Sequence, residues 1–290
     1  MILLTGGTGT AGSEISKALQ RMAVHHRSVV RDRAKAAASA GEYVELVEAD
    51  LSRPETLEAA LDGVEKALLL TAASPESLQQ ERGFIRMAKR AGVRYLVKFS
   101  AYGASLKAPH FFGRQHGQGE RALEDSGLPF TMLRPNGFFQ NFLGNAASIQ
   151  TRSAFHAPAG GMKYSAVDVR DIAAVAARVL TEPGHQWQRY TITGPEALSH
   201  AEIAERFSEV LGRTIQYVDV PEDAARDWML AAGIPAWTVE KVLDLYRYYR
   251  TGAAAEVTDH VERVGRKAPI AFLQFVRDRA AAFAGSHGGA

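Results

Sequence analysis

The chain has 290 residues, a formal net charge of +2 and a hydrophobic share of 46%, which is enough apolar material for one large or two modest domains. It contains no cysteine, which excludes disulfide frameworks, thiolate metal sites and cysteine nucleophiles and favours a cytoplasmic location. Lysine and arginine form no dense block and no apolar run reaches the ~20 residues of a membrane span, so neither nucleic acid nor a membrane is expected as a partner.

Short apolar runs alternate with helical patterns through the first half of the chain. Strands are predicted at 1–6, 27–31, 43–51, 66–72, 94–101 and 129–135, with helical patterns around 15–22 and within 34–40, 52–63 and 74–92. Residues 111–127 predict a loop with aromatic residues and then a charged helix that begins near His116. Ser52 and Glu55 have the spacing of a capping box, and Ser74 followed by Pro75 predicts the start of another helix. Because parallel strands need crossovers of helix length, the alternation predicts a Rossmann-like, doubly wound parallel α/β sheet.

The second half is less regular. It predicts an extended piece and a helix over 162–180, a strand over 188–194, a helix over 199–212 and a strand over 214–220. Ser199 and Glu202 form a second capping-box pattern. We therefore expect a dinucleotide-binding domain at 1–193 and a smaller, mostly helical substrate or cap region at 194–290.

The stretch "TGGTGTAG" follows the first strand directly and opens a helix. Gly6, Gly9 and Gly12 recur every third residue, and Gly7, Gly9 and Gly12 also satisfy G-x-G-x-x-G. In this context glycines let the backbone approach a pyrophosphate, and the helix N-terminus offers free N–H groups to it. The motif predicts a dinucleotide site that includes Thr8 and Thr10; a glycine-rich turn without a ligand is the alternative.

The end of the second strand bears on which dinucleotide is bound. The stretch "VVRDRAK" places Arg31 at the strand end, with Lys35 shortly after it, and an arginine there suits the 2′-phosphate of NADPH. Asp32 could instead accept a ribose hydroxyl of NADH, and Arg31 could be a solvated surface charge. Further along the same sheet edge, the adenine and the rest of the cofactor are expected beside Asp50, Leu51, Thr71, Ala72 and Ala73.

These motifs together resemble the NmrA-like group of atypical short-chain dehydrogenase/reductases over nearly the whole chain. The resemblance rests on "TGGTGTAG", "VVRDRAK", "ADLSRPETLEAAL", "GVRYLVKFSA", "ERALEDSGLPFTMLRPNGFFQNF", "YSAVDVRDIAAVAARVL" and "YTITGPEALSHAEIAERFSEVLGR". It implies NADPH or NADH as cofactor. Members of the group include quinone, azo-dye and triphenylmethane-dye reductases, and others that bind NAD(P) as redox sensors without turnover.

The chain departs from the wider dehydrogenase pattern at its usual acid. Typical members carry Tyr-x-x-x-Lys on the helix after the fifth strand, and the glutamate that follows the lysine by four matches Glu120. His116 then stands at the lysine position and Phe112 at the tyrosine position. Without the phenolic acid, we expect hydride acceptors that delocalise the incoming charge, such as quinones and conjugated aromatics, including aromatic natural products.

Several side chains near the predicted nicotinamide position have more than one interpretation. His116 could bind the nicotinamide ribose and relay a proton, or cap the helix in solvent. Ser100 could donate to a substrate oxygen or merely end its strand, and Tyr102 could replace the missing acid or rest on the surface. The backbone at Pro135 and Asn136 should pass the nicotinamide amide.

Aromatic residues complete the candidate site. Phe138 and Phe139 could wall a substrate pocket, although one of them is expected in the core. Phe112 and, from the cap, Trp228 are further candidates for substrate contact, with cap packing or a subunit contact as the alternative for the latter. No histidines cluster at metal-ligand spacing, and no metal is expected. The sequence predicts an NAD(P)H-dependent reductase, and the alternative is a non-catalytic NADP(H)-binding redox sensor. A homodimer is the assembly considered for either.

Overall fold

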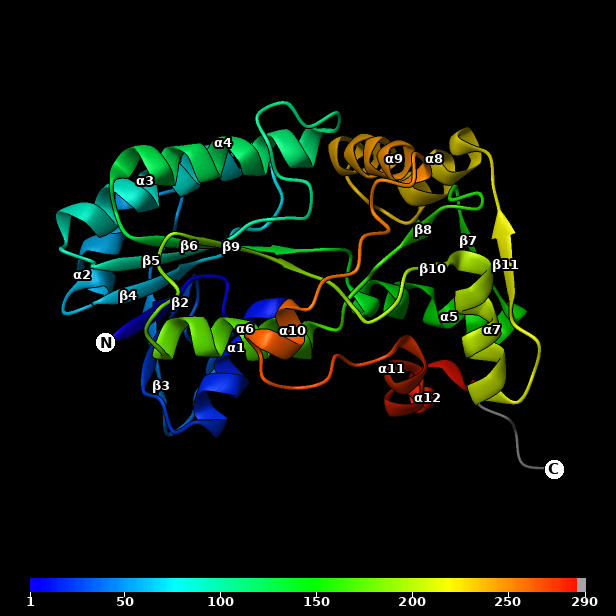
Figure 1. Ribbon diagram of the computed structural model, residues 1–290, viewed down its shortest axis with the longest axis horizontal. Coiled ribbons are helices and arrows are strands. Elements are labelled where there is room, and N and C mark those ends of the chain that lie inside the picture. Colours follow the sequence, from blue (N-terminus) through cyan, green and yellow to red (C-terminus); the bar gives the residue numbers. More distant parts are fainter. Residues whose placement is uncertain (286–290) are drawn as a thin grey trace.

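A computed structural model describes residues 1–285 of the chain (Figure 1). Its strands are β1 (Ile2–Leu4), β2 (His26–Val30), β3 (Val44–Glu48), β4 (Lys66–Leu69), β5 (Tyr95–Phe99), β6 (Phe130–Pro135), β7 (Ala154–Ala157), β8 (Lys163–Tyr164), β9 (Gln188–Ile192), β10 (Leu198–Ser199) and β11 (Gln216–Asp219). Its α-helices are α1 (Thr10–Arg21), α2 (Leu57–Leu61), α3 (Ser77–Arg90), α4 (Phe111–Ser126), α5 (Ala146–Arg152), α6 (Val169–Thr181), α7 (His200–Leu211), α8 (Glu222–Ala231), α9 (Ala236–Arg250), α10 (His260–Arg263), α11 (Phe272–Asp278) and α12 (Ala280–Phe283). Three short 3₁₀ helices lie at η1 (Ala37–Ser39), η2 (Pro54–Thr56) and η3 (Phe139–Asn145).

Seven parallel strands form the central sheet in the order β3-β2-β1-β4-β5-β6-β9. The chain winds outward from β1 to β3 and then returns to place β4 on the other side of β1. The order therefore reverses between β1 and β4, which is where doubly wound sheets bind their ligands. Thr5 joins the two strands there, because its hydroxyl donates to the carbonyl of Leu70 and accepts from the N–H of the same residue, both at 2.8 Å. The predicted Rossmann-like sheet is confirmed.

Helices cover both faces of the sheet, as Figure 1 shows, with α2, α3 and α4 on one face and α1, α6 and α10 on the other. Strand β1 illustrates why. Ile2 and Leu4 pack with α1 and α6, whereas Leu3 between them packs with α2 and α3. Side chains alternate across a strand, so an unbroken apolar run is buried on both faces.

The helical end of the molecule draws on chain segments from both sides of residue 193. Strand β7 pairs with β11 and β8 pairs with β10, so residues 154–164 share small sheets with the C-terminal part. One apolar cluster joins Phe142 and Phe155 to Phe207, Phe272 and Phe283. The cap is therefore built from more than 194–290, of which 286–290 lie outside the described residues, and the two-domain division stays a prediction.

The helix start signals of the sequence are confirmed at one position and wrong at two others. The Ser199–Glu202 capping box is present at α7, where each side chain takes the other residue's backbone N–H. The box predicted at Ser52 is wrong, because the Ser52 hydroxyl donates to Asp50 and a 3₁₀ turn starts at Pro54. The helix predicted from Ser74 begins at Ser77.

The helix that carries His116 starts earlier than the sequence indicated. Helix α4 begins at Phe111, and its N-cap is His110, whose Nδ1 accepts a hydrogen bond from the N–H of Gly113 at 3.3 Å. His116 therefore lies inside the helix and does not cap it. Within residues 1–285, no helix combines the length and apolar character needed to cross a membrane.

Candidate functional site

One long cavity of about 910 Å³ runs over the carboxyl ends of the central strands and reaches helix α9. This volume is at the upper end of the range for ligand pockets. Most of the residues predicted for the site line it: Gly6, Thr8, Gly9, Thr10, Arg31, Asp50, Leu51, Thr71, Ala72, Ala73, Ser100, Tyr102, Phe112, His116, Pro135, Asn136 and Phe138. Gly12, Lys35 and Trp228 do not.

The glycine turn shapes one end of the cavity. Gly6 has a positive φ of 66°, and a Cβ there would lie 2.6 Å from Leu70 Cδ2. A Cβ on Gly12 would lie 2.1 Å from the Gly6 carbonyl oxygen, so Gly12 serves the close approach of helix and turn without touching the cavity. Helix α1 has no side-chain N-cap and no acid in its first turn, which leaves its N–H groups and positive dipole end to an anion.

The end of β2 separates the three charges predicted there. Arg31 lines the cavity and is exposed. Asp32 turns away from it, because its carboxylate accepts the N–H of Lys35 at 3.1 Å and lies 3.5 Å from the ammonium of the same lysine. Lys35 is itself 87% exposed and outside the cavity. Only Arg31 of these three is placed to meet a phosphate.

Asp50 borders the cavity at the end of β3. Hydrogen bonds from the N–H and hydroxyl of Ser52 lower the pKa of the Asp50 carboxyl, and the nearby charges of Arg53 and Arg31 act in the same direction. The Asp50 carboxylate is therefore fixed by Ser52 at the cavity edge, beside Arg31.

Two buried carboxylates support the middle of the cavity; Glu81 lines it and Glu120 lies behind it. Glu81 of α3 is 3% exposed; its Oε1 accepts the Thr71 hydroxyl at 3.1 Å and the Lys98 ammonium at 2.5 Å. Glu120 of α4 is 4% exposed and accepts the Ser100 hydroxyl at 2.6 Å. The guanidinium of Arg134 binds Glu120 through two hydrogen bonds of 2.8 and 2.5 Å. A hydroxyl has one proton, so Ser100 has none left for a substrate oxygen.

Tyr102 fits neither of its predicted roles. Its side chain is only 9% exposed, so it does not rest on the surface. Its hydroxyl donates to the carbonyl of Ala253 at 2.8 Å, with Glu256 Oε2 at 3.3 Å. Burial, with the Glu256 carboxylate nearby, raises the pKa of Tyr102 to about 12. The phenol is therefore a poor proton donor. Tyr102 lines the cavity, but its hydroxyl proton is not available to a ligand.

Two histidines face the same region in neutral form. Burial, together with the positive charge of Lys98, lowers the pKa of His116 to about 3. Burial also lowers the pKa of His110, whose ring stacks on Tyr248 with centroids 4.4 Å apart. His116 Nδ1 is enclosed and has no hydrogen-bond partner among residues 1–285. At neutral pH the His116 ring is uncharged, so the proton relay suggested by its ordinary pKa does not fit this environment.

Asn136 uses its side chain to join the sheet to the cap. Its Nδ2 donates to Ser165 Oγ and to the Ala254 carbonyl, both at 3.0 Å. Its Oδ1 accepts the Tyr249 hydroxyl at 3.0 Å and the N–H of Gly137 at 2.8 Å. The amide is fully occupied, and the backbone N–H of Asn136 donates to the Ile192 carbonyl at 3.0 Å, so of this residue only the backbone carbonyl is left to accept from a ligand.

Apolar side chains line the end of the cavity nearest the cap. Phe138 packs edge-on against Phe99, at 6.3 Å between centroids, and both line the cavity together with Phe112 and Leu245. Phe139 lies in the core at 2% exposure, as expected for one of the pair. Trp228 is 54% exposed on α8 and outside the cavity, so its predicted substrate contact is not made here.

Sequence reasoning missed several residues that form or support the cavity wall. Glu81, His110 and Tyr249 line the cavity, Lys98 lies behind it, and none of the four was proposed for the site. One signal was available: the lysine of "YLVKF" interrupts a buried strand, and a buried lysine needs a partner. The partner could not be named, because Glu81 lies 17 residues away on another element.

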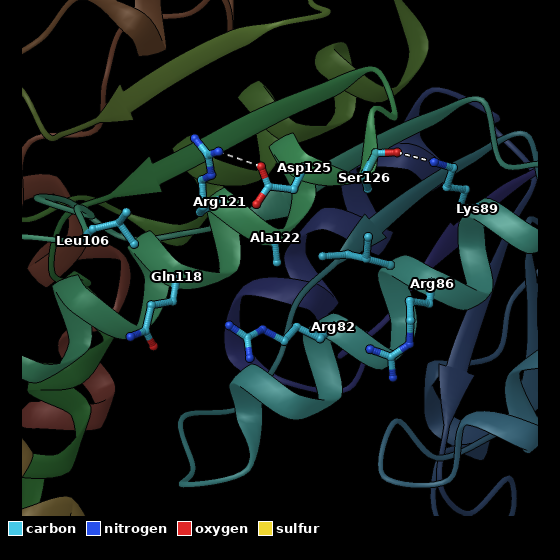
Figure 2. A pocket seen from close by; sticks show the side chains of 10 residues that line it. Arg82, Arg86, Lys89, Leu106, Gln118, Arg121, Ala122, Asp125 and Ser126 are labelled. Atoms are coloured by element: carbon cyan, nitrogen blue, oxygen red, sulfur yellow. Dashed lines mark hydrogen bonds and ion pairs between the residues drawn. The ribbon is translucent and has the colours of Figure 1, made fainter.

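A second hollow, the basic groove, lies on the outer side of α3 and α4 and shares no residue with the cavity. Figure 2 shows Arg82 and Arg86 on α3 and Arg121 on α4, with Lys89 bound to the Ser126 carbonyl at 2.6 Å. Arg121 pairs with Asp125 at 2.9 Å, whereas Arg82 and Arg86 have no acidic partner in the described part of the chain.

The sheet order, the glycine turn at its switch point and the long cavity above it define a dinucleotide-binding protein of the Rossmann-like class. The chain belongs to the NmrA-like family, whose model matches residues 1–270.

Known relatives match nearly the whole chain. It is 38% identical over 283 residues to the NAD(P)H azoreductase of Xenophilus azovorans, covering 98% of this chain and 99% of that one. The NADPH complex of the NADPH-dependent quinone oxidoreductase QOR2 of Escherichia coli superposes with a TM-score of 0.88 at 27% identity, over 96% and 99% of the two chains. The NADP(H) complex of Citrobacter sp. triphenylmethane reductase gives 0.86 at 25% identity, over the same shares.

Proposed function

We propose that the chain is an NAD(P)H-dependent reductase that transfers hydride to a quinone-like or other conjugated aromatic acceptor. When bound, NADPH would supply the hydride and be left as NADP⁺. A quinone or azo acceptor takes the hydride together with one proton, whereas a cationic triphenylmethane dye takes the hydride alone. The names of the three relatives support this class of reaction, since all are reductases of dyes or quinones.

The cavity offers a place for each part of the cofactor. The free N–H groups at the start of α1 suit the pyrophosphate, and Arg31 suits a 2′-phosphate. Asp50 and Leu51, which line the cavity beside Arg31, would border the adenosine. The nicotinamide half would lie over Thr71, Ser100 and His116, with the Pro135–Asn136 backbone beside it.

The observation that carries the choice of acceptor is that the hydroxyl protons in the middle of the cavity are already committed. Thr71 donates to Glu81, Ser100 to Glu120, Tyr102 to Ala253 and Tyr249 to Asn136. The two nearby histidines are neutral, so none of these side chains supplies a proton at neutral pH. An acceptor that spreads the added charge over a π-system can take its proton from water afterwards, whereas an isolated ketone needs an acid.

Anaerobic stopped-flow oxidation of NADPH tests this proposal. We expect turnover with 1,4-naphthoquinone, an azo dye and a triphenylmethane dye. Cyclohexanone should react slower by about 10²–10⁴, the usual contribution of a general acid. Equal rates with cyclohexanone would show that an acid is present after all, and oxidation with none of the four acceptors would overturn the enzyme assignment.

Arg31→Ala should weaken NADPH binding and leave NADH binding nearly unchanged. A hydrogen bond to a charged group contributes about 1.5–3 kcal/mol, or roughly 10- to 100-fold in Kd. Calorimetry with both reduced cofactors measures the two affinities. Arg33→Ala, an exposed neighbour outside the cavity, is the matched control. Equal losses for NADPH and NADH would remove Arg31 from the 2′-phosphate site.

The second candidate, a non-catalytic NADP(H) sensor, is supported by the basic groove. Helices α3 and α4 present one face to the cavity, through Glu81 and His116, and the other to the groove, through Arg82 and Arg121. The sensor hypothesis predicts a protein that binds NADPH tightly but does not oxidise it with any of the acceptors tested. The homodimer and the cytoplasmic location also remain proposals, to be tested by sedimentation and by cell fractionation.

A further inference from the structure

Two hydroxyls with the same arrangement lie side by side in the cavity. Thr71 follows β4 and Ser100 follows the neighbouring strand β5, and both line the cavity. Each gives its single proton to a buried carboxylate on a helix, Thr71 to Glu81 and Ser100 to Glu120. What each hydroxyl oxygen still offers is a lone pair, so both can only accept from a ligand.

The carboxylates are built to remain acceptors. Each is paired with a cation from the next strand of the sheet, Glu81 with Lys98 of β5 and Glu120 with Arg134 of β6. Lysine and arginine side chains carry donors and no acceptor, so each cation can only donate to its carboxylate. Both Glu81 and Glu120 therefore accept from a cation on one side and from a hydroxyl on the other.

A glycine in helix α4 leaves the space that the Glu81–Lys98 ion pair occupies. A Cβ on Gly119 of α4 would lie 2.0 Å from Glu81 Oε2 and 2.8 Å from Lys98 Cε. Real Cβ atoms do not approach so closely, so the ion pair fills the space that any other residue at 119 would need. The pair is thus a built part of the cavity wall.

We propose that Glu81 and Glu120 are positioning residues that fix Thr71 and Ser100 as hydrogen-bond acceptors for the nicotinamide half of NAD(P)H. That half carries the matching donors, the ribose hydroxyls and the carboxamide NH₂. A substrate carbonyl oxygen carries no proton and meets only lone pairs at these two positions. This inference rests on the proposed cofactor, and it assigns the two hydroxyls to the cofactor and not to the substrate.

Binding measurements test the proposal without turnover. Thr71→Val removes the acceptor, and the double variant E81Q/K98M replaces the ion pair by neutral groups of similar size, with an amide N–H that can donate to Thr71. Both variants should weaken the binding of NADPH by about tenfold, the usual effect of one hydrogen bond. Their affinity for 2′,5′-ADP, which lacks the nicotinamide half, should stay within about twofold of the parent's. Thr71→Ser should restore the affinity for NADPH.

A second buried pair supplies the control. Asp171, fully buried, is bound by Lys267 on the far face of the sheet and outside the cavity. The variant D171N/K267M should leave both affinities unchanged, whatever its effect on stability. If E81Q/K98M does not fold, Thr71→Val and Thr71→Ser still decide the question.

Facial selectivity gives a readout that a merely structural role would not move. With NADPH deuterated on one face of C4, the parent, Thr71→Ser and D171N/K267M should transfer label from a single face, whereas Thr71→Val and E81Q/K98M should transfer it from both. Equal weakening of NADPH and 2′,5′-ADP, or no weakening of either, would overturn the positioning role. Absence of turnover with every acceptor would overturn only the proposed reaction, because the difference between the two affinities would remain measurable.

Discussion

At the scale of single residues, the cavity is defined by where its protons are held. Ser100 and Tyr102 both looked available for acid chemistry from the sequence, yet each donates its proton to a partner behind the cavity wall. The partners, Glu120 and the Ala253 carbonyl, come from elements distant in the chain. Residue type therefore indicated side chains that line the cavity, and only the three-dimensional contacts showed what each can donate.

Tyr102→Phe should leave catalysis intact. The phenol binds a backbone carbonyl of the cap, so its loss should cost about 1 kcal/mol of unfolding free energy and slow turnover less than about threefold. Steady-state rates with naphthoquinone and urea denaturation measure the two effects. Tyr190→Phe removes another phenol hydrogen bond, to His185 at 2.9 Å, and is the matched control. Turnover slowed by about 10²–10⁴ in Tyr102→Phe alone would identify that phenol as the acid.

His116 should make folding stability depend on pH. Its pKa is lowered to about 3 in the folded chain, against about 6.5 when unfolded, so between these values the unfolded chain binds a proton that the folded chain does not. Stability is therefore lost as pH falls from 6.5 toward 3, by up to about 1.4 kcal/mol per pH unit for one group. In urea denaturation at several pH values, His116→Gln should show a shallower loss. Identical slopes would contradict the lowered pKa of the half-buried His116 ring.

At the scale of elements, α4 is placed by its glycines. A Cβ on Gly117 would lie 2.3 Å from the backbone carbon of Ser105, and one on Gly113 would lie 2.6 Å from Ala108 Cβ. The helix therefore packs directly on the preceding loop. This contact, together with the Gly119 gap for the ion pair, holds His116 against the cavity.

Gly117→Ala should destabilise the protein although alanine favours helices. The added methyl meets backbone atoms, which cannot move as a side chain can, and overpacking of this kind typically costs about 1–3 kcal/mol, more than the roughly 1 kcal/mol gained in helix propensity. Gly144→Ala is the control, because a Cβ there has nothing within 4 Å. Thermal unfolding should show a lower Tm for the first variant only, and an unchanged Tm for Gly117→Ala would mean that the loop yields.

Elements were predicted best where their signals are local. The six strands of the first half, the strand at 188–192 and the Ser199 cap follow from apolar runs and short-range spacing. Helix starts at 77 and 111 were misplaced, because the first lacks a side-chain cap and the second uses a histidine, which is not a common N-cap. The Glu81–Lys98 ion pair could not be predicted from the sequence, because it depends on how α3 packs over β5.

At the scale of the whole molecule, the cap and the sheet are joined beside the cavity. Asn136, at the end of β6, binds Ser165 and Ala254 through its amide nitrogen and Tyr249 of α9 through its oxygen. Tyr102 adds a bond to Ala253 in the same connecting segment. The apolar end of the cavity therefore depends on bonds between segments more than 100 residues apart.

Asn136→Ala should loosen this junction and with it the substrate end of the cavity. The change removes four hydrogen bonds and leaves the buried Tyr249 hydroxyl and the Gly137 N–H without their acceptor, whereas the Ala254 carbonyl keeps the Ser165 N–H. We therefore expect a loss of about 3 kcal/mol or more in unfolding free energy. Hydrogen exchange should quicken in residues 164–168 and 249–258 and remain slow in β1 and β4, whose contacts do not involve Asn136. Asn145→Ala, at a position without a side-chain cap bond, should leave the exchange pattern of the parent. Uniform acceleration across the sheet would mean that cap and sheet unfold as one unit, and that Asn136 supports the whole fold and not the junction alone.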